Sequence, residues 1–203
     1  MKTKALLAVV VAGAMTFAAC NKKIDEKTMA DINQFGTDWS ALGEKATNWS
    51  KQLTETTQHA KEFATKQTEM MASMASSKDE GMKTKMQDMT KTATENAANF
   101  ESMTNDWNSW KTSWEENTKS FSEWQAKVAK GEVSSEDAVK GLADWKTKMT
   151  ESQQKVDNWN TAYNSTKESW DKNMASCDEM SKSMTSTMAT PTKMMPSKGT
   201  MKK

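Results

Sequence analysis

Sulfur-bearing side chains are the residues of this sequence best suited to chemistry. The chain has 203 residues, including 18 Met and two Cys. Thioether and thiolate sulfur are soft ligands that select Cu(I) over harder metal ions. Six sulfur residues recur at the spacing of a helical stripe, and three further methionines, Met71, Met82 and Met174, stand near them. The six are Met70, Met74, Met86, Met89, Cys177 and Met180.

These sulfur residues predict a Cu(I) site if the segments that carry them pack together. Two other interpretations stay open. Methionine is flexible and fills irregular space in a core, and it can be oxidised sacrificially to the sulfoxide. We therefore predict no obligatory cofactor, and we keep a Cu(I)-binding or metal-handling function as the alternative to a purely structural one.

The sequence lacks the residue combinations that are typical of an active site. His59 is the one histidine, and no nucleophile lies near it along the chain. Glycine-rich phosphate loops and CxxC pairs are absent. Acidic residues such as Glu115 and Glu116 alternate with lysine, which is typical of a solvated helix surface. We predict that the protein is not an enzyme.

The charge balance argues against nucleic acid as a partner. The chain carries 28 basic and 27 acidic residues, for a net charge of +1, so it offers no strong attraction to phosphates. All of the basic residues are lysine. Arginine is the residue that binds phosphate and carboxylate with two parallel hydrogen bonds, so recognition of that kind is not expected here.

Three runs of apolar residues at alternating steps of three and four predict the elements that position these side chains. The runs extend from Ile32 to Met74, from Met86 to Val128 and from Ala138 to Met184. Every Trp, Phe and Tyr after residue 20 falls on one of them. Such a repeat places one apolar stripe along a helix. The fold class predicted is all-α, an elongated antiparallel three-helix bundle or coiled coil that resembles spectrin repeats in outline.

Breaks in the periodicity set the predicted helices at about residues 28–77, 80–130 and 135–188. The small and polar stretch at residues 76–81 predicts the first turn. Gly131 follows the second run as a helix stop, and Ser134 or Ser135 can cap the third helix. If residues 76–81 stay helical instead, one helix of about a hundred residues would need an intermolecular partner. We predict that residues 76–81 form a turn and that the protein is a monomer.

Counting heptad positions back from the turns predicts which residues share a layer of the core. Aromatic residues meet at one end, where Gly36, Gly43 and Gly141 leave room for indoles, and sulfur residues meet at the other. The predicted layers are Trp39 with Phe121 and Trp145; Trp49 with Trp110 and Val156; Met70 with Met89 and Cys177; and Met74 with Met86 and Met180.

The amino terminus predicts export. Lys2 and Lys4 precede an apolar stretch at residues 5–14, which is too short to span a bilayer, and small residues then lead to Cys20. This order is typical of a signal peptide. The stretch Phe17-Ala18-Ala19-Cys20 resembles the lipobox of bacterial lipoproteins, although those usually have leucine where Phe17 stands.

The lipobox resemblance implies that residues 1–19 are removed and that Cys20 is acylated, for example with palmitate. Asn21 follows the cysteine where aspartate would retain an enteric lipoprotein in the inner membrane, so the resemblance points to the outer membrane. Whether the protein faces the periplasm or the cell surface is left open by the sequence. The alternative is an ordinary secretory signal that happens to contain a cysteine.

The remaining segments are a lipid-anchored linker at residues 20–27, the bundle at residues 28–188 and a Met, Lys and Pro tail at residues 189–203. The tail has no periodicity and is expected to be disordered. The layout resembles the murein lipoproteins of enteric bacteria, although the chain ends in Met-Lys-Lys instead of Tyr-Arg-Lys. We expect a lipid-anchored envelope protein that binds an envelope protein or peptidoglycan at the far end of the bundle.

Overall fold

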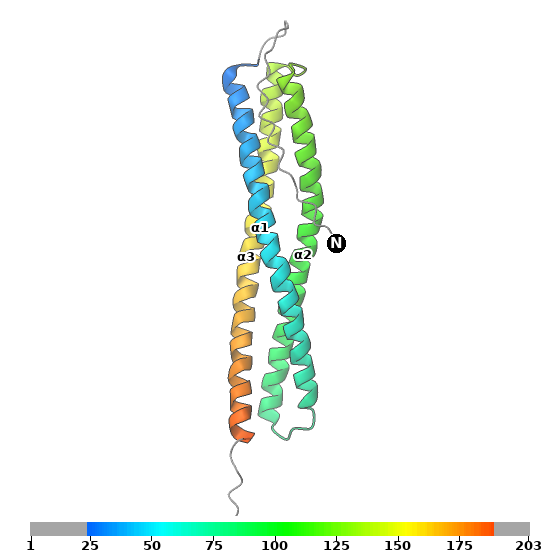
Figure 1. Ribbon diagram of the computed structural model, residues 1–203, viewed down its shortest axis with the longest axis vertical. Helices are drawn as coiled ribbons and strands as arrows, with labels where there is room; N and C mark the ends of the chain where they lie inside the picture. Colours follow the sequence, from blue (N-terminus) through cyan, green and yellow to red (C-terminus); the bar gives the residue numbers. More distant parts are fainter. Residues whose placement is uncertain (1–23, 189–203) are drawn as a thin grey trace, which may run out of the picture. The chain divides into compact units, whose positions relative to one another are not determined.

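A computed structural model describes residues 24–188 of the chain, with side chains to residue 182. These residues form three helices, α1 (Glu26–Ser73), α2 (Glu80–Ala129) and α3 (Ser135–Met188) (Figure 1). No strand occurs between residues 24 and 188, and the predicted all-α three-helix bundle is confirmed. The predicted signal peptide, Cys20 and the tail lie outside the described residues.

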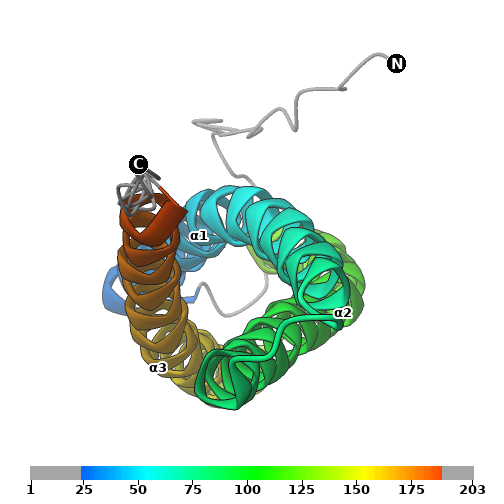
Figure 2. The same cartoon turned by 90° about the horizontal axis from the view of Figure 1, so that it is seen from below.

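The bundle divides into two compact units, each built from one segment of every helix. Within the described part, unit 1 contains residues 24–59 and 98–165, and unit 2 contains residues 60–97 and 166–188. In each unit the three segments lie side by side around a common axis, and segments that follow one another along the chain run antiparallel (Figure 2). Their apolar stripes face this axis.

Helix α1 begins at a capping aspartate. Asp25 Oδ1 accepts a hydrogen bond of 2.8 Å from the backbone N–H of Thr28, and Asp25 Oδ2 accepts one of 2.7 Å from the Thr28 hydroxyl. These bonds satisfy a donor that the first turn of a helix leaves free. The backbone N–H of Thr28, followed by its hydroxyl, lowers the pKa of Asp25.

The first turn occupies residues 74–79, two residues earlier than predicted. Helix α1 ends at Ser73 as the hydrogen bonds tighten from four residues back to three. The Met74 N–H is shared between Met70 O at 3.2 Å and Met71 O at 3.1 Å, and the Ala75 N–H bonds to Ala72 O at 3.2 Å. Asp79 then caps α2 by accepting the Met82 N–H at 2.9 Å. The alternative of one continuous helix is therefore wrong for this structure.

The second turn has the glycine stop that the sequence predicts. Gly131 has φ of 72°, a left-handed conformation that glycine adopts without strain. The amides of Gly131 and Glu132 bond to Val128 O and Lys127 O, both at 3.0 Å, which is the Schellman pattern. Ser134 caps α3 by accepting the Asp137 N–H at 3.1 Å.

The core of unit 1 is aromatic. Trp39, Phe121 and Trp145 are buried and in mutual contact, with ring centroids 5.5 to 6.1 Å apart, as predicted. Burying side chains of this size removes a large apolar area from water and is the main stabilising term available to the bundle.

The layer predicted for Trp49 is wrong. Its ring stacks on Trp159 at 5.5 Å and meets Trp107 at 6.1 Å, three residues before the predicted partner Trp110. The first turn begins earlier than predicted, and at the level of Trp49 the residue of α1 faces an earlier residue of α2. The predicted pairing of Trp39 with Phe121 is kept, although Trp39 also stacks on Trp114.

Two of the three glycines make room for indoles, as predicted. A Cβ atom on Gly141 would lie 2.8 Å from Trp124 Nε1, and one on Gly43 would lie 2.9 Å from Trp114 Nε1. Both distances are shorter than a non-bonded contact between a carbon and a nitrogen atom allows. At Gly36 the nearest atom, in the ring of Phe121, is 3.4 Å away, which is ordinary contact.

Candidate functional site

The sulfur residues predicted to converge do so in unit 2. Met74, Met86, Met89, Cys177 and Met180 are buried and form one apolar cluster. Met70 packs against this cluster but is only half-buried. Met71, Met82 and Phe63 pack against it in the same way, whereas Met174 is 37% exposed. We call the seven packed methionines and Cys177 the sulfur cluster.

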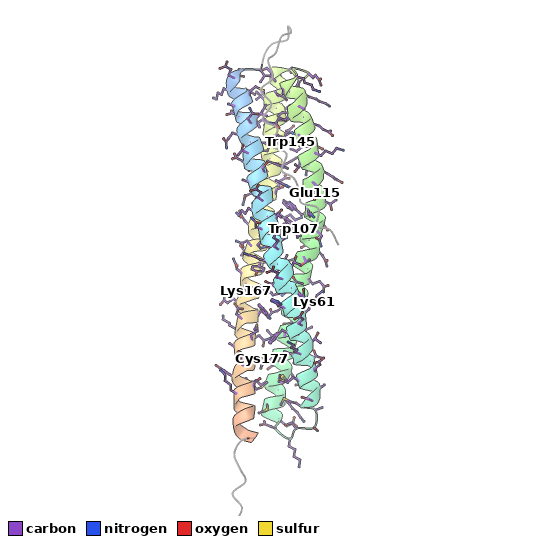
Figure 3. All side chains as sticks on the ribbon, in the orientation of Figure 1. Lys61, Trp107, Glu115, Trp145, Lys167 and Cys177 are labelled. Carbon is purple, nitrogen blue, oxygen red and sulfur yellow. The ribbon has the colours of Figure 1, made fainter. Side chains whose placement is uncertain are left out.

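All three helices and the first turn bring these residues together. Met70 and Met71 lie in the last turn of α1, Met74 opens the turn, and Met86 lies in the second turn of α2. The turn reverses the chain, so these residues return to the same end of unit 2. Helix α3 supplies Cys177 from the third side (Figure 3).

Buried hydrogen bonds between helices fix the backbone beside the sulfur cluster. Asn173 Nδ2 donates to Met89 O at 2.9 Å, which ties α3 to α2 one turn from Cys177. The Thr90 hydroxyl donates to Gln67 O at 3.4 Å and ties α2 to α1. Both bonds replace apolar packing with a directional contact, so they hold the register of the three segments at this level.

Two buried amides in unit 2 remain unsatisfied. Gln67 Oε1 and Asn96 Nδ2 find no hydrogen-bond partner among residues 24–182, although the two side chains are only 3% and 4% exposed. A buried polar atom without a partner costs about 1–3 kcal/mol. Their positions on the apolar stripe were visible in the sequence, but sequence analysis assigned them no role. This part of the core is therefore not arranged for stability alone.

Cys177 is a protonated thiol at neutral pH. Burial raises its pKa to about 11, and the neighbouring Asp178 carboxylate acts in the same direction. A metal ion that takes this sulfur as a thiolate must therefore displace the proton. Before that step, every donor of the sulfur cluster is neutral.

This donor set suits a soft monovalent cation. Neutral thioethers in a buried site offer no charge to offset a divalent ion, and burying an uncompensated charge is costly. Cu(I) has the lower charge and the preference for sulfur. Among residues 24–188, no three His, Cys, Asp or Glu side chains lie close enough together to hold a metal ion.

The other residue considered in sequence analysis, His59, is exposed in unit 1. The chain was also compared with protein-family models, with curated proteins and with solved structures. None of the three comparisons found a match. A function for this chain therefore has to be argued from its own residues.

Proposed function

We propose that this chain is a non-catalytic, lipid-anchored protein of the bacterial outer membrane, held there by acylated Cys20. The observation that carries this proposal is the lipobox-like stretch at residues 17–20, after which α1 begins at Glu26. Residues 21–25 are the only ones between the predicted anchor and the helix, and they can span at most about 22 Å. The bundle is thereby held close to the bilayer by a short tether.

This mode of attachment needs no spanning segment. In the described part of the chain, no helix has the length and apolar character needed to cross a bilayer. The bundle would instead meet the membrane through the lipid on Cys20. One acyl chain gives only marginal binding, whereas the several chains of a bacterial lipoprotein anchor stably.

The helix surfaces support a structural or binding role. Surface hydroxyls bond to the carbonyl four residues back along their own helix, as in Thr47 to Gly43 at 2.8 Å. Surface charges also pair within one helix, as in Lys111 with Glu115 at 3.8 Å. Such pairs add little stability, but they leave a polar surface without a strong field, which suits a spacer among other envelope components.

We place the binding end for an envelope protein or peptidoglycan at unit 2, which holds the first turn and the carboxyl end of α3. We also propose that the chain acts as a monomer. Its large apolar side chains pack against one another within the chain. Among the described residues, the only large apolar side chains that are exposed are Val139 and Met174.

Metabolic labelling with a tagged palmitate tests the anchor. We expect label in the wild-type protein and in the membrane fraction, and none in Cys20→Ser. The matched control is Cys177→Ser, which removes the other cysteine and should keep the label. Label that enters Cys20→Ser as well as the wild type, or that enters neither, would exclude the anchor.

A second function, Cu(I) binding, is favoured by one observation. Three helices and a turn deliver the sulfur cluster to one buried place, and the cluster consists of the ligand type that Cu(I) prefers. An envelope protein meets oxidising conditions, in which a thioether keeps its affinity for Cu(I) while free thiols are lost. In this second proposal, the bundle would hold or pass on Cu(I) at unit 2.

An anaerobic competition titration against a chromogenic Cu(I) chelator tests this second proposal. The protein is the full chain in detergent with Cys20→Ser, so that Cys177 is its one thiol. We expect binding of one Cu(I), weakened by about tenfold or more when Met86→Leu and Met89→Leu are added, which corresponds to about 1.4 kcal/mol. Leucine keeps the volume and the fold.

The matched control for the titration is Met149→Leu, since Met149 packs in the core of unit 1, away from the sulfur cluster. It should bind Cu(I) like the parent protein. Equal binding by all three proteins, or none by the parent, would leave the sulfur cluster as core packing and would not affect the proposal of a lipid anchor.

A further inference from the structure

Unit 1 contains a continuous network of indole rings that neither the anchor nor the sulfur cluster uses. Trp39 stacks on Trp114 with centroids 4.0 Å apart and planes at 6°. Trp114 stacks on Trp110 at 4.9 Å, and Trp110 contacts Trp107 at 5.0 Å. This first half of the network therefore passes from α1 to α2 through rings in direct contact (Figure 3, in which Trp107 is labelled).

The second half of the network leads to the one tyrosine of the chain. Trp107 contacts Trp49 at 6.1 Å, and Trp49 contacts Tyr163 at 6.3 Å. Trp159 provides a parallel connection, since it meets Trp110 at 5.7 Å and stacks on Trp49 at 5.5 Å with planes at 4°. We call these rings, from Trp39 to Trp49 and Trp159, the indole network.

Rings of this kind in contact can pass a one-electron oxidation. Indole and phenol are among the side chains that lose an electron most easily, and a hole on one ring can move to a neighbour that it touches. Trp114 is half-buried and gives an oxidant access to the network. Trp49 and Tyr163 are each 8% exposed, so an external oxidant meets them far less readily.

Lysines bias the route through the network. Lys155 Nζ lies 5.5 Å from the ring centroid of Trp159, and a cation over an indole makes loss of an electron from that ring less favourable. Among the described residues, no lysine lies over the ring of Trp107 or Trp49. The path through Trp107 to Trp49 is therefore preferred over the path through Trp159.

Hydrogen bonding determines where the hole comes to rest. Trp49 Nε1 is buried and has no hydrogen-bond partner in the described part of the chain, so an oxidised Trp49 has no neighbour there to take its proton and remains a mobile radical cation. Tyr163 Oη lies 2.9 Å from Thr56 Oγ1. When Tyr163 donates in this bond, the Thr56 hydroxyl can take the proton of Tyr163 as it gives its own proton to solvent water.

We propose that unit 1 is a hole relay that carries one-electron oxidation from Trp114 to Tyr163. A one-electron oxidant takes an electron from an indole and is reduced. The hole moves through the indole network to Trp49, and Tyr163 then gives one electron to Trp49. The Tyr163 proton passes to the Thr56 hydroxyl as that hydroxyl gives its own proton to water, and a neutral tyrosyl radical remains. The substrate class is oxidising radicals and one-electron metal oxidants.

Photochemical oxidation of the full chain tests the relay. The protein, with Cys20→Ser, is illuminated in detergent with a ruthenium polypyridyl sensitiser and a sacrificial electron acceptor, and radicals are trapped by freezing for electron paramagnetic resonance. Because Tyr163 is the one tyrosine, any tyrosyl signal belongs to it. We expect a clear tyrosyl signal in the parent protein that falls several-fold in Trp49→Phe, since phenylalanine does not carry the hole.

The matched control is Trp124→Phe, which also removes one tryptophan. Trp124 contacts Phe121 and lies outside the indole network, so the tyrosyl yield of the Trp124→Phe variant should equal that of the parent. Equal yields in Trp49→Phe and the parent would overturn the relay, as would the absence of a tyrosyl signal from the parent. If Trp49→Phe does not fold by circular dichroism, Trp110→Phe interrupts the network at another ring and must lower the yield.

Discussion

Trp39 and Trp114 place their indole rings 4.0 Å apart and nearly parallel. Two transitions this close couple and produce a paired positive and negative band in circular dichroism. We expect such a couplet in the native protein. It should be reduced in Trp114→Phe, in which the stacked pair Trp49 and Trp159 remains, and retained in full in Trp124→Phe. A native protein without the couplet, or a Trp114→Phe variant that keeps it in full, would show that these two rings are not stacked in solution.

Gly141 should resist substitution despite its helical position. In an exposed helix, alanine is favoured over glycine by about 1 kcal/mol. At residue 141 the added Cβ would meet the indole of Trp124 at 2.8 Å, and overpacking of this kind costs about 1–3 kcal/mol. We therefore expect Gly141→Ala to lower the midpoint of thermal unfolding.

The matched control for Gly141 is Gly81→Ala, because Gly81 lies in the first turn of α2 and a Cβ added there would lie 3.4 Å from its nearest neighbour, Asp79 Oδ1. This variant should be as stable as the parent or more stable. If both variants shift the midpoint in the same direction, the contact with Trp124 does not explain the glycine.

The sulfur cluster should tolerate leucine and not alanine. Met86 is fully buried, and Met→Leu conserves volume, so Met86→Leu should cost less than about 1.5 kcal/mol in the free energy of unfolding. Met86→Ala leaves a cavity and should cost about 2–5 kcal/mol. Urea unfolding measures both. Similar losses for the two variants would mean that the sulfur of Met86, and not its bulk, stabilises unit 2.

The raised pKa of Cys177 leads us to expect a loss of stability at alkaline pH. Its pKa is raised from 9.0 to about 11 in the folded chain, so the folded state favours the protonated thiol. The stabilisation is therefore complete below pH 9 and is lost as pH rises toward 11. The free energy of unfolding should fall across this range. The fall should be smaller in Cys177→Ser, in which only the lysines and Tyr163 still titrate there.

Alkylation gives an independent check on Cys177. A buried, protonated thiol reacts slowly with iodoacetamide, so the rate in the folded protein should lie well below that in urea at neutral pH. An equal rate in the two states would show that Cys177 is accessible to solvent in the folded protein and would contradict its burial.

The sequence predicts the helices well because their signals are local. Trp39, Phe121 and Trp145 could be matched from periodicity alone, and Gly131 and Ser134 mark the second turn through their own backbone chemistry. These features depend on nearby residues and on the heptad repeat, both of which can be read without coordinates.

The register between α1 and α2 could not be predicted in the same way. No glycine or proline ends α1, and its last residues are as helix-compatible as those before them, so the end at Ser73 depends on the bonds that close the turn. This small displacement changed the partner of Trp49 from Trp110 to Trp107.

The sulfur cluster likewise has features that the sequence predicts and features that it does not. Topology alone predicts that the sulfur residues gather, because the turn returns α2 along α1. The partial exposure of Met70 and the raised pKa of Cys177 depend on how each side chain packs. The same holds for the indole network, in which a shift of one turn would exchange the contacting rings.

The mass of the intact protein purified from membranes tests the proposal of a lipid anchor most directly. We expect a chain that lacks residues 1–19, begins at Cys20 and carries the added mass of acyl chains on its first residue, as fragmentation of the amino-terminal peptide would locate. A chain that still begins at Met1, or one cleaved without added acyl mass at Cys20, would contradict it.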